Sequence, residues 1–214
     1  MSRSRFTPQT IRAFVPRLER PYESNLVFPG VFTAAQCQRI VETGLALEPR
    51  AGLVGTLPDE YGADGETRRA RIAWIPSSDE HLWIFDKLAR VAERANRMYE
   101  FDLLGFTEDL QFTCYDRAGS FYGWHQDGLE GELAGRKLSM VLQLSDPASY
   151  EGSDLEMFQI EQDYPDDLRA EWGRSVRGQG AVIAFPSYEF HRVTPLAAGR
   201  RYSLVSWIGG PPFR

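Results

Sequence analysis

Two histidines and one aspartate stand at spacings that suit a metal ion. The chain has three histidines, and His125 is followed two residues later by Asp127. Residues i and i+2 of a strand face the same side, so both side chains could reach one ion; they could equally be solvated groups at a strand end. His191 offers a second imidazole after a short apolar run. Two histidines and a carboxylate suit iron(II) or zinc and leave coordination positions open.

An arginine and a serine follow the second histidine closely. Arg201 comes ten residues after His191, and Ser203 comes two residues after Arg201. On a strand these two side chains share one face. A guanidinium pairs bidentately with a carboxylate, and a serine hydroxyl can add another hydrogen bond. A buried arginine beside a metal site therefore indicates a dicarboxylate co-substrate, which binds Arg201 at one end and chelates the metal with its keto-acid end.

The elements that must position these residues are short strands in the second half of the chain. Segments of four to eight residues, rich in β-branched and aromatic types, alternate there with turns. Many short strands in succession favour an antiparallel sandwich or jelly roll over a parallel α/β sheet. The expected strands are Leu110–Tyr115, Lys137–Leu144, Asp154–Gln159, Ala181–Phe185 and Arg201–Ile208.

The first half carries helical patterns instead. Thr33 and Gln36 can form a capping box ahead of apolar residues at helical spacing. A second helix is expected to begin at Ser77, with Glu80 three residues on, and to run to Tyr99. The intervening segment Ala51–Arg71 is rich in Gly, Asp, Glu and Arg and is expected to be an exposed loop.

These patterns predict one domain over residues 1–214. An N-terminal arm (1–25) precedes a helical support region (26–100), and a β core (101–214) follows. A second loop is expected at 164–177, on the rim of the site. The arm is rich in arginine, which is typical of a transit peptide and also of a solvated arm. Prolines interrupt any amphipathic helix there, so we favour the arm.

Composition excludes several classes of protein. The chain has 43% hydrophobic residues, so it is not disordered. Its net charge of −6 argues against nucleic-acid binding. Cys37 and Cys114 are too few for a disulfide framework and are interpreted as buried thiols. No apolar run suggests a membrane helix or a secretory signal, so a cytoplasmic location is expected. The sequence does not indicate an oligomeric state.

From about Val31 onward the chain resembles the Fe(II)/2-oxoglutarate-dependent dioxygenases, in particular their prolyl 4-hydroxylase-like branch. The resemblance implies an α+β, mainly β fold: a double-stranded β-helix (jelly-roll or cupin-like) core, with N-terminal helices packed on one sheet. Four stretches in the expected order carry it: Phe28–Gln38, Tyr115–Asp127, Leu138–Leu155 and Phe185–Gly199, followed by Arg201 and the run Ser203–Pro211.

The same resemblance assigns roles to individual residues. His125, Asp127 and His191 match the iron ligands, and Arg201 matches the residue that binds the C5 carboxylate of 2-oxoglutarate. The carboxylate ligand distinguishes this chain from the halogenases of the superfamily, which carry a small residue at that position. The implied cofactors are Fe(II), the co-substrate 2-oxoglutarate and O2, with ascorbate as a further candidate.

Three further residues are implied to contact 2-oxoglutarate. Ser203 completes an Arg-x-Ser arrangement with Arg201. Tyr115 matches a tyrosine that hydrogen-bonds 2-oxoglutarate in the prolyl hydroxylase branch, although its spacing to His125 is one residue longer than the pattern. Tyr122 is the alternate for that role.

The implied reaction is hydroxylation of an unactivated C–H bond, with release of succinate and CO2. The expected substrate is an amino-acid side chain, prolyl or other, in a peptide or in a free small molecule. Alternatives are an oxidative demethylase of nucleic-acid bases and a non-catalytic cupin-like binding module; the acidic charge argues against the first and the complete ligand set against the second. Arg68, Arg69 and Arg71 could contact substrate, but ion pairs with acidic residues of their loop are favoured.

Overall fold

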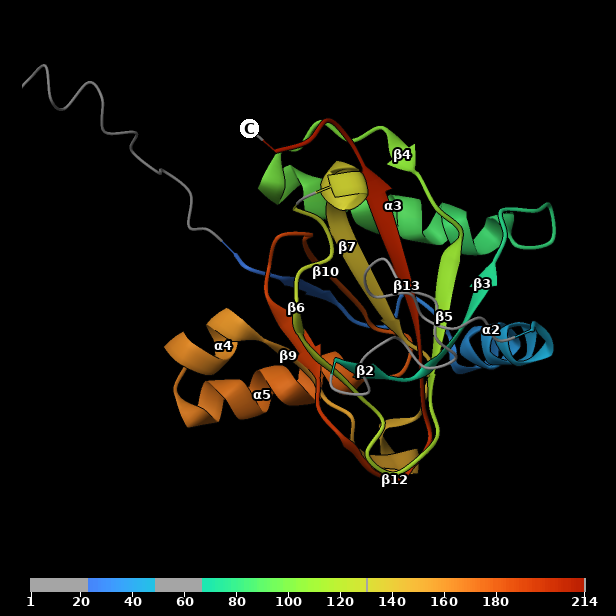
Figure 1. Cartoon of the computed structure of the whole chain (residues 1–214), viewed down its shortest axis with the longest axis vertical. Coiled ribbons are helices and arrows are strands. Elements are labelled where there is room, and N and C mark those ends of the chain that lie inside the picture. The colour runs from blue at the N-terminus through green and yellow to red at the C-terminus, as the bar shows by residue number, and fades with distance from the viewer. Residues whose placement is uncertain (1–22, 49–66, 130, 214) are drawn as a thin grey trace, which may run out of the picture.

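The computed structural model describes residues 23–48, 67–129 and 131–213, and within them strands form two main antiparallel sheets. The larger, here the major sheet, has the order β1-β10-β7-β13-β5-β3, with β4 paired to the end of β13 (Figure 1). Its strands are β1 (Leu26–Phe28), β3 (Arg71–Ile75), β4 (Gly105–Phe106), β5 (Leu110–Tyr115), β7 (Arg136–Gln143), β10 (Val182–Pro186) and β13 (Arg201–Gly209).

The second, here the minor sheet, has the order β2-β6-β11-β9. Two further strands pair with each other near one end of both sheets. The strands of the minor sheet are β2 (Arg68–Arg69), β6 (Phe121–His125), β9 (Leu155–Met157) and β11 (His191–Val193), and the separate pair is β8 (Tyr150–Gly152) with β12 (Leu196–Gly199).

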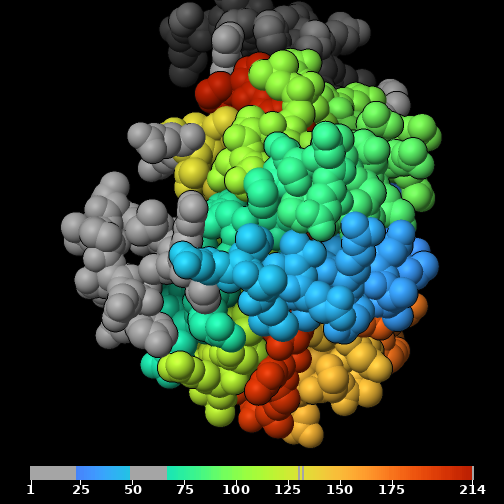
Figure 2. Space-filling view, turned by 90° about the vertical axis from the view of Figure 1, so that its right-hand side faces the viewer, coloured from blue at the N-terminus to red at the C-terminus, as the bar shows by residue number. Residues whose placement is uncertain are grey.

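Two helices, α2 (Ala34–Ala46) and α3 (Leu82–Tyr99), lie side by side over one face of the major sheet (Figure 2). The predicted capping box of α2 is confirmed, since the Thr33 side chain and the Gln36 side chain each bond the other residue's backbone N–H. Gly44 of α2 packs on Phe112, where an added Cβ would lie 2.3 Å from the ring. The helical layer expected on one sheet is therefore present.

The second helix begins five residues later than the capping pattern predicted. α3 starts at Leu82, and Ser77 does not cap it. Instead Ser78 closes a turn: its carbonyl accepts hydrogen bonds from the backbone N–H groups of His81 and Leu82. The His81 ring also bonds the Pro76 carbonyl at 3.0 Å, so the histidine outside the metal constellation is a structural residue at the helix start.

The strand predictions for β5, β7, β10 and β13 are confirmed to within about one residue at each end. The predicted strand Asp154–Gln159 is too long, because the chain turns into the short helix α4 (Phe158–Asp163) after Met157. The loop expected at 164–177 is wrong: most of it is the helix α5 (Asp166–Arg177). Acidic residues in its first turn and arginines in its last turn suit the helix dipole and were the overlooked signal.

The region 26–100, predicted to be helical support, also contributes strands β1, β2 and β3 to the two sheets. These strands are two to five residues long, too short for a periodic pattern to reveal. Of the predicted loop Ala51–Arg71, residues 51–66 lie outside the described residues, as do residues 1–22 of the predicted arm. Among the described residues no helix is long and apolar enough to cross a membrane.

Alternation along β7 separates two layers of side chains. Leu138, Met140 and Leu142 join the core between the major sheet and the helices, whereas Val141 belongs to a second core between the two sheets. Ser139 and Gln143 share the Val141 side of the strand, because residues two apart in a strand face the same way. The major sheet thus has an apolar face under the helices and a partly polar face toward the minor sheet.

Candidate metal centre

The two predicted histidine ligands are direct partners across strands of the minor sheet. His125, the last residue of β6, pairs with His191, the first residue of β11. Asp127 lies between them: its carboxylate oxygens are 3.7 Å from Nε2 of His125 and 3.6 Å from Nε2 of His191. One ligand atom from each residue lies within 4.8 Å of the others. The structure therefore brings the three predicted residues together in a group that fits one metal ion.

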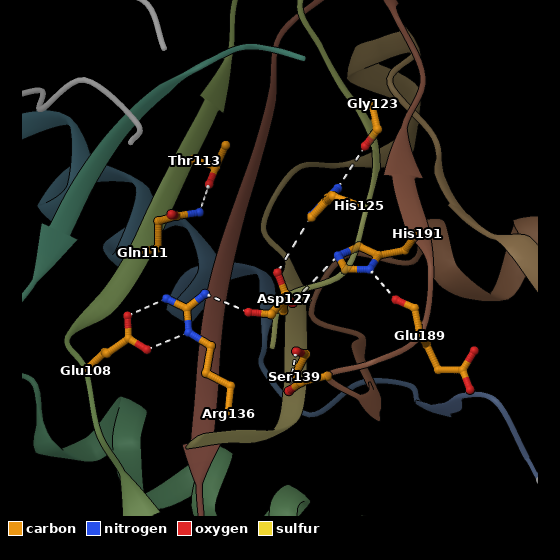
Figure 3. Close-up of polar contacts among 11 residues, drawn as sticks. Glu108, Gln111, Thr113, Gly123, His125, Asp127, Arg136, Ser139, Glu189 and His191 are labelled. Carbon is orange, nitrogen blue, oxygen red and sulfur yellow. Dashed lines mark hydrogen bonds and ion pairs between the residues drawn. The ribbon is translucent and has the colours of Figure 1, made fainter. Parts of the chain in front are cut away.

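Backbone carbonyls hold both imidazole rings in one orientation. Nδ1 of His125 lies 2.8 Å from the Gly123 carbonyl, and Nδ1 of His191 lies 3.0 Å from the Glu189 carbonyl (Figure 3). A ring that donates its Nδ1–H to a carbonyl keeps the Nε2 lone pair free for a metal. Both Nε2 atoms accordingly face Asp127.

Asp127 is held from outside the strand that carries His125. Strand β6 ends at His125, so the expectation that the two residues share one strand face is wrong. The Asp127 backbone N–H donates to Ser187, and its carbonyl accepts from Arg136 at 3.2 Å. Arg136 is in turn held by both carboxylate oxygens of Glu108 (Figure 3). This chain of contacts fixes the backbone of the carboxylate ligand.

The protonation states of the group suit metal binding. Burial, followed by the neighbouring His191, lowers the pKa of His125 to about 3. Burial alone would raise the pKa of Asp127, but the two imidazoles, with Ser139 and Trp207, lower it overall. Neutral imidazole and ionised carboxylate are the forms that bind metals. Oδ2 of Asp127 is buried and has no hydrogen-bond partner within the described part of the chain, as expected of a group that completes a metal site.

Arg201 is the largest fully buried side chain of the described residues, with 1% of its surface exposed. Its Nε and Nη2 donate to the Gln143 side-chain oxygen at 3.2 and 2.9 Å, and its Cζ lies 5.3 Å from the centre of the Tyr115 ring. Its Nη1 is buried with no hydrogen-bond partner among the residues described. A buried cation with an unused donor fits an incoming carboxylate.

Gln143 was missed by the sequence analysis. It is the last residue of β7 and is 2% exposed. The sequence nevertheless contains a signal. Every second residue of β7, between the leucines and Met140, faces the inside of the sandwich, where an apolar side chain is expected. Gln143 is a polar residue at such a position. Such a residue on an inner face is a candidate for ligand contact.

The three further residues implied to contact 2-oxoglutarate, Ser203, Tyr115 and Tyr122, lie at different ends of the site. Ser203 is 2% exposed, shares the strand face of Arg201, and pairs across to Gln143 and Thr113. Tyr115 lies opposite Arg201 in the β5–β13 pairing. Tyr122 instead stacks on the His125 ring, with centroids 3.5 Å apart.

A bulge in β6 explains why Tyr122 faces the metal ligands. His191 pairs with His125, whereas Val193 pairs with Tyr122, so β6 has one more residue than β11 over this stretch. A bulge redirects side chains and often lies beside a functional site. Tyr122 and His125, three residues apart, therefore share one face, which simple alternation would forbid. Trp124 is 37% exposed and packs edge-on against Phe158, away from the ligands.

Comparisons with known proteins agree with this geometry. Residues 110–209 match the family described as the 2OG-Fe(II) oxygenase superfamily. A PKHD-type hydroxylase of Synechococcus sp. (strain CC9605) is 38% identical over 91 residues, 42% of this chain and 37% of that protein. A PKHD-type hydroxylase of Hyphomonas neptunium is 36% identical over 94 residues, 42% of this chain and 38% of that protein. The match thus spans well under half the length of these relatives.

Solved structures share the fold over most of the chain. A prolyl-4-hydroxylase of Pseudomonas putida superposes with a TM-score of 0.60 at 20% identity, covering 88% of this chain and 93% of that one. A prolyl hydroxylase of Trichoplax adhaerens, in complex with a hypoxia inducible factor peptide fragment, gives 0.64 at 16% identity, covering 87% and 83%. The matched segment 110–209 contains His125, Asp127, His191 and Arg201. By these matches residues 110–209 are similar to the 2OG-Fe(II) oxygenase superfamily, and the chain shares its fold with prolyl hydroxylases.

Proposed function

We propose that this protein is an Fe(II)- and 2-oxoglutarate-dependent dioxygenase that hydroxylates an unactivated C–H bond of an amino-acid side chain, with the major and minor sheets as a double-stranded β-helix. The observation that supports this most is Arg201, whose buried Nη1 has no hydrogen-bond partner within the described residues, together with the three candidate metal ligands. A metal-binding module without a dicarboxylate co-substrate would have no use for that donor.

In this proposal His125, Asp127 and His191 hold the iron. Bound iron, together with 2-oxoglutarate and O2, supplies the oxidising power that converts substrate C–H to C–OH and releases succinate and CO2. The Gly123 and Glu189 carbonyls keep both imidazoles oriented, so that the rings do not have to reorient when metal binds.

The remaining residues bind and orient the co-substrate. Arg201 binds the C5 carboxylate of 2-oxoglutarate through Nη1, while Gln143 holds the other side of the guanidinium. Ser203, on the same face of β13, adds a hydrogen bond. Of the two tyrosines, Tyr115 lies at the carboxylate end and Tyr122 at the metal end. We therefore assign Tyr115 to the C5 carboxylate region and Tyr122 to the surroundings of the iron.

The proposed substrate is an amino-acid side chain, prolyl or other, peptide-bound or free. Support for a peptide comes from the Trichoplax adhaerens neighbour, whose structure contains a peptide fragment. The acidic net charge of −6 gives no support to a nucleic-acid substrate.

Anaerobic titration with Fe(II) and 2-oxoglutarate tests the proposal. A visible charge-transfer band is expected when both are bound, and succinate is expected once O2 is admitted. Arg201→Gln should weaken 2-oxoglutarate binding by about 2–5 kcal/mol, roughly thirtyfold or more, and leave metal affinity unchanged.

The neighbouring exposed Arg200 provides a matched control, and Arg200→Gln should behave as the wild type. Metal binding without the band and without succinate would instead support a binding module. Unchanged 2-oxoglutarate affinity in Arg201→Gln would refute the role given to Arg201.

A further inference from the structure

A second buried arginine, Arg68, lies beside the metal centre. It is on β2, directly opposite Tyr122 of β6, and 6% of its surface is exposed. Its Cζ lies 4.6 Å from the centre of the Tyr122 ring, and that ring stacks on His125. The guanidinium is thus separated from a metal ligand by one aromatic ring, and its charge helps to lower the pKa of His125.

Arg68 differs from the other two arginines at the site in that its side chain has no hydrogen-bond or ion-pair partner among the described residues. Arg136 is held by Glu108, and Arg201 by Gln143. Nε of Arg68 is buried without a hydrogen-bond partner, and no ion pair joins Arg68 to a carboxylate among the described residues. Its sequence neighbour Arg71 does have such a partner, since it pairs with Asp116.

A buried guanidinium needs an anion. Arginine remains protonated at every pH that a protein survives, so it cannot escape burial by losing its charge. Removing a charge from water is costly unless the charge is paired. Stacking on Tyr122 offsets only part of that cost, because a cation–π contact leaves the N–H donors unsatisfied.

The co-substrate does not supply this anion. Under the proposed function 2-oxoglutarate has two carboxylates: one binds Arg201, and the other chelates iron with the keto group. Neither remains for Arg68. No carboxylate among the described residues meets this need either, and the molecule that is hydroxylated has to approach the same iron.

From this geometry we propose that Arg68 binds a carboxylate of the primary substrate, next to the carbon that is hydroxylated. The inference rests on the proposed function and deepens it, because it specifies an anionic substrate. Two sources offer this chemistry: the α-carboxylate of a free amino acid and an acidic side chain in a peptide.

Nuclear magnetic resonance tests the binding without knowledge of the substrate. In [15N]arginine-labelled protein loaded with Zn(II) and saturated with 2-oxoglutarate, the Arg68 Nε–H signal is identified by its loss in Arg68→Lys. Titration with propionate should shift this signal saturably, and the neutral isostere propionamide should not. No shift, an equal shift with propionamide, or a shift that appears only when 2-oxoglutarate is omitted would each overturn the inference.

Turnover then identifies the source of the carboxylate. Succinate formation is measured with each L-amino acid against its amide, and with proline-containing tripeptides in which glutamate is exchanged for glutamine. The carboxylate member of a pair should stimulate turnover. Arg68→Gln should raise its KM at least tenfold and leave the KM for 2-oxoglutarate unchanged, whereas Arg69→Gln, an exposed neighbour, should have no effect.

The two failures are distinguishable. If wild-type protein forms no succinate and shows no charge-transfer band, the proposed function fails. If wild-type turnover is present and Arg68→Gln leaves every substrate KM unchanged, only the role of Arg68 fails.

Discussion

The two faces of the major sheet are equally buried, but they differ in how far the polar atoms of their side chains find hydrogen-bond partners. On β13, Leu204 faces the helices and is 1% exposed, while its neighbour Ser203 faces the metal centre and is 2% exposed. The helix-facing side is packed mainly by apolar contacts. The site-facing side holds Arg201, with a donor that has no partner among the described residues. Burial alone therefore does not separate core from site.

Orphaned polar atoms also occur on the helix side, where Nε1 of Trp83 and the hydroxyl of Ser206 have no partner among the described residues. Ser206 is 1% exposed. Nothing in the structure explains its orphaned hydroxyl.

The largest effect should follow from removing the carboxylate at the centre of the site. Asp127→Ala is expected to abolish succinate formation and to lower metal affinity by more than the roughly 10–100-fold that loss of a supporting group costs. The free energy of unfolding of the metal-free protein should not fall, because the change removes a buried charge. Calorimetric metal titration and chemical denaturation measure the two quantities.

Asp163→Ala, at an exposed position on α4, is the matched control and should leave metal affinity unchanged. If Asp127→Ala instead destabilised the metal-free chain as much as a core truncation does, the contrast between the two faces would not hold.

Adjacent residues of β13 allow a more direct comparison. Leu204→Ala should lower the free energy of unfolding by about 2–5 kcal/mol and leave the KM for 2-oxoglutarate unchanged. Ser203→Ala should raise the KM for 2-oxoglutarate about two- to tenfold, which corresponds to about 0.5–1.5 kcal/mol of binding free energy. Its effect on the free energy of unfolding should be smaller than that of Leu204→Ala. Urea denaturation and steady-state kinetics on both variants provide the measurements; equal changes in stability would contradict the division of labour.

The smallest effect concerns the two thiols, which both lie in the helix-side core and are buried as predicted. Burial raises the pKa of Cys37 and of Cys114 to about 11. The folded thiols therefore stay neutral where unfolded thiols, near pH 9, begin to ionise. Their contribution to stability is complete below pH 9 and is lost as the pH rises toward 11.

At pH 8 both thiols should react with Ellman's reagent only as fast as the protein unfolds. The single variants Cys37→Ala and Cys114→Ala assign each thiol. Rapid reaction of the folded wild type would show that the helix-facing side is accessible to solvent.

The sequence singles out His125, Asp127, His191 and Arg201 because their signals are local, and the structure brings the first three together. His125 and Asp127 are two residues apart, and Arg201 opens a strand whose alternation is clear. The assignment of strands β5, β7, β10 and β13 succeeded for the same reason, since each strand shows its pattern within one segment.

What the sequence could not predict depends on pairing between distant segments. The role of Gln143 requires β7 to lie beside β13, and the bulge that turns Tyr122 inward exists only in the register between β6 and β11. The burial of Arg68 depends on the pairing of a two-residue strand with β6. In the sequence alone, Arg68 is one of several arginines beside an acidic loop, and the acidic residues predicted to pair with them lie outside the described residues.

The position of β13 has a consequence for how the protein folds. This strand follows its partners in sequence, yet it lies between β7 and β5 in the major sheet. Until it inserts, β1, β10 and β7 have no hydrogen-bonded connection through the sheet to β5 and β3. Pairing between segments that are distant in sequence loses the entropy of closing long loops before new contacts form. Insertion of β13 is therefore expected to be a late and slow step. Because β13 carries Arg201, the co-substrate pocket and the two-sided sheet would then be completed in the same event.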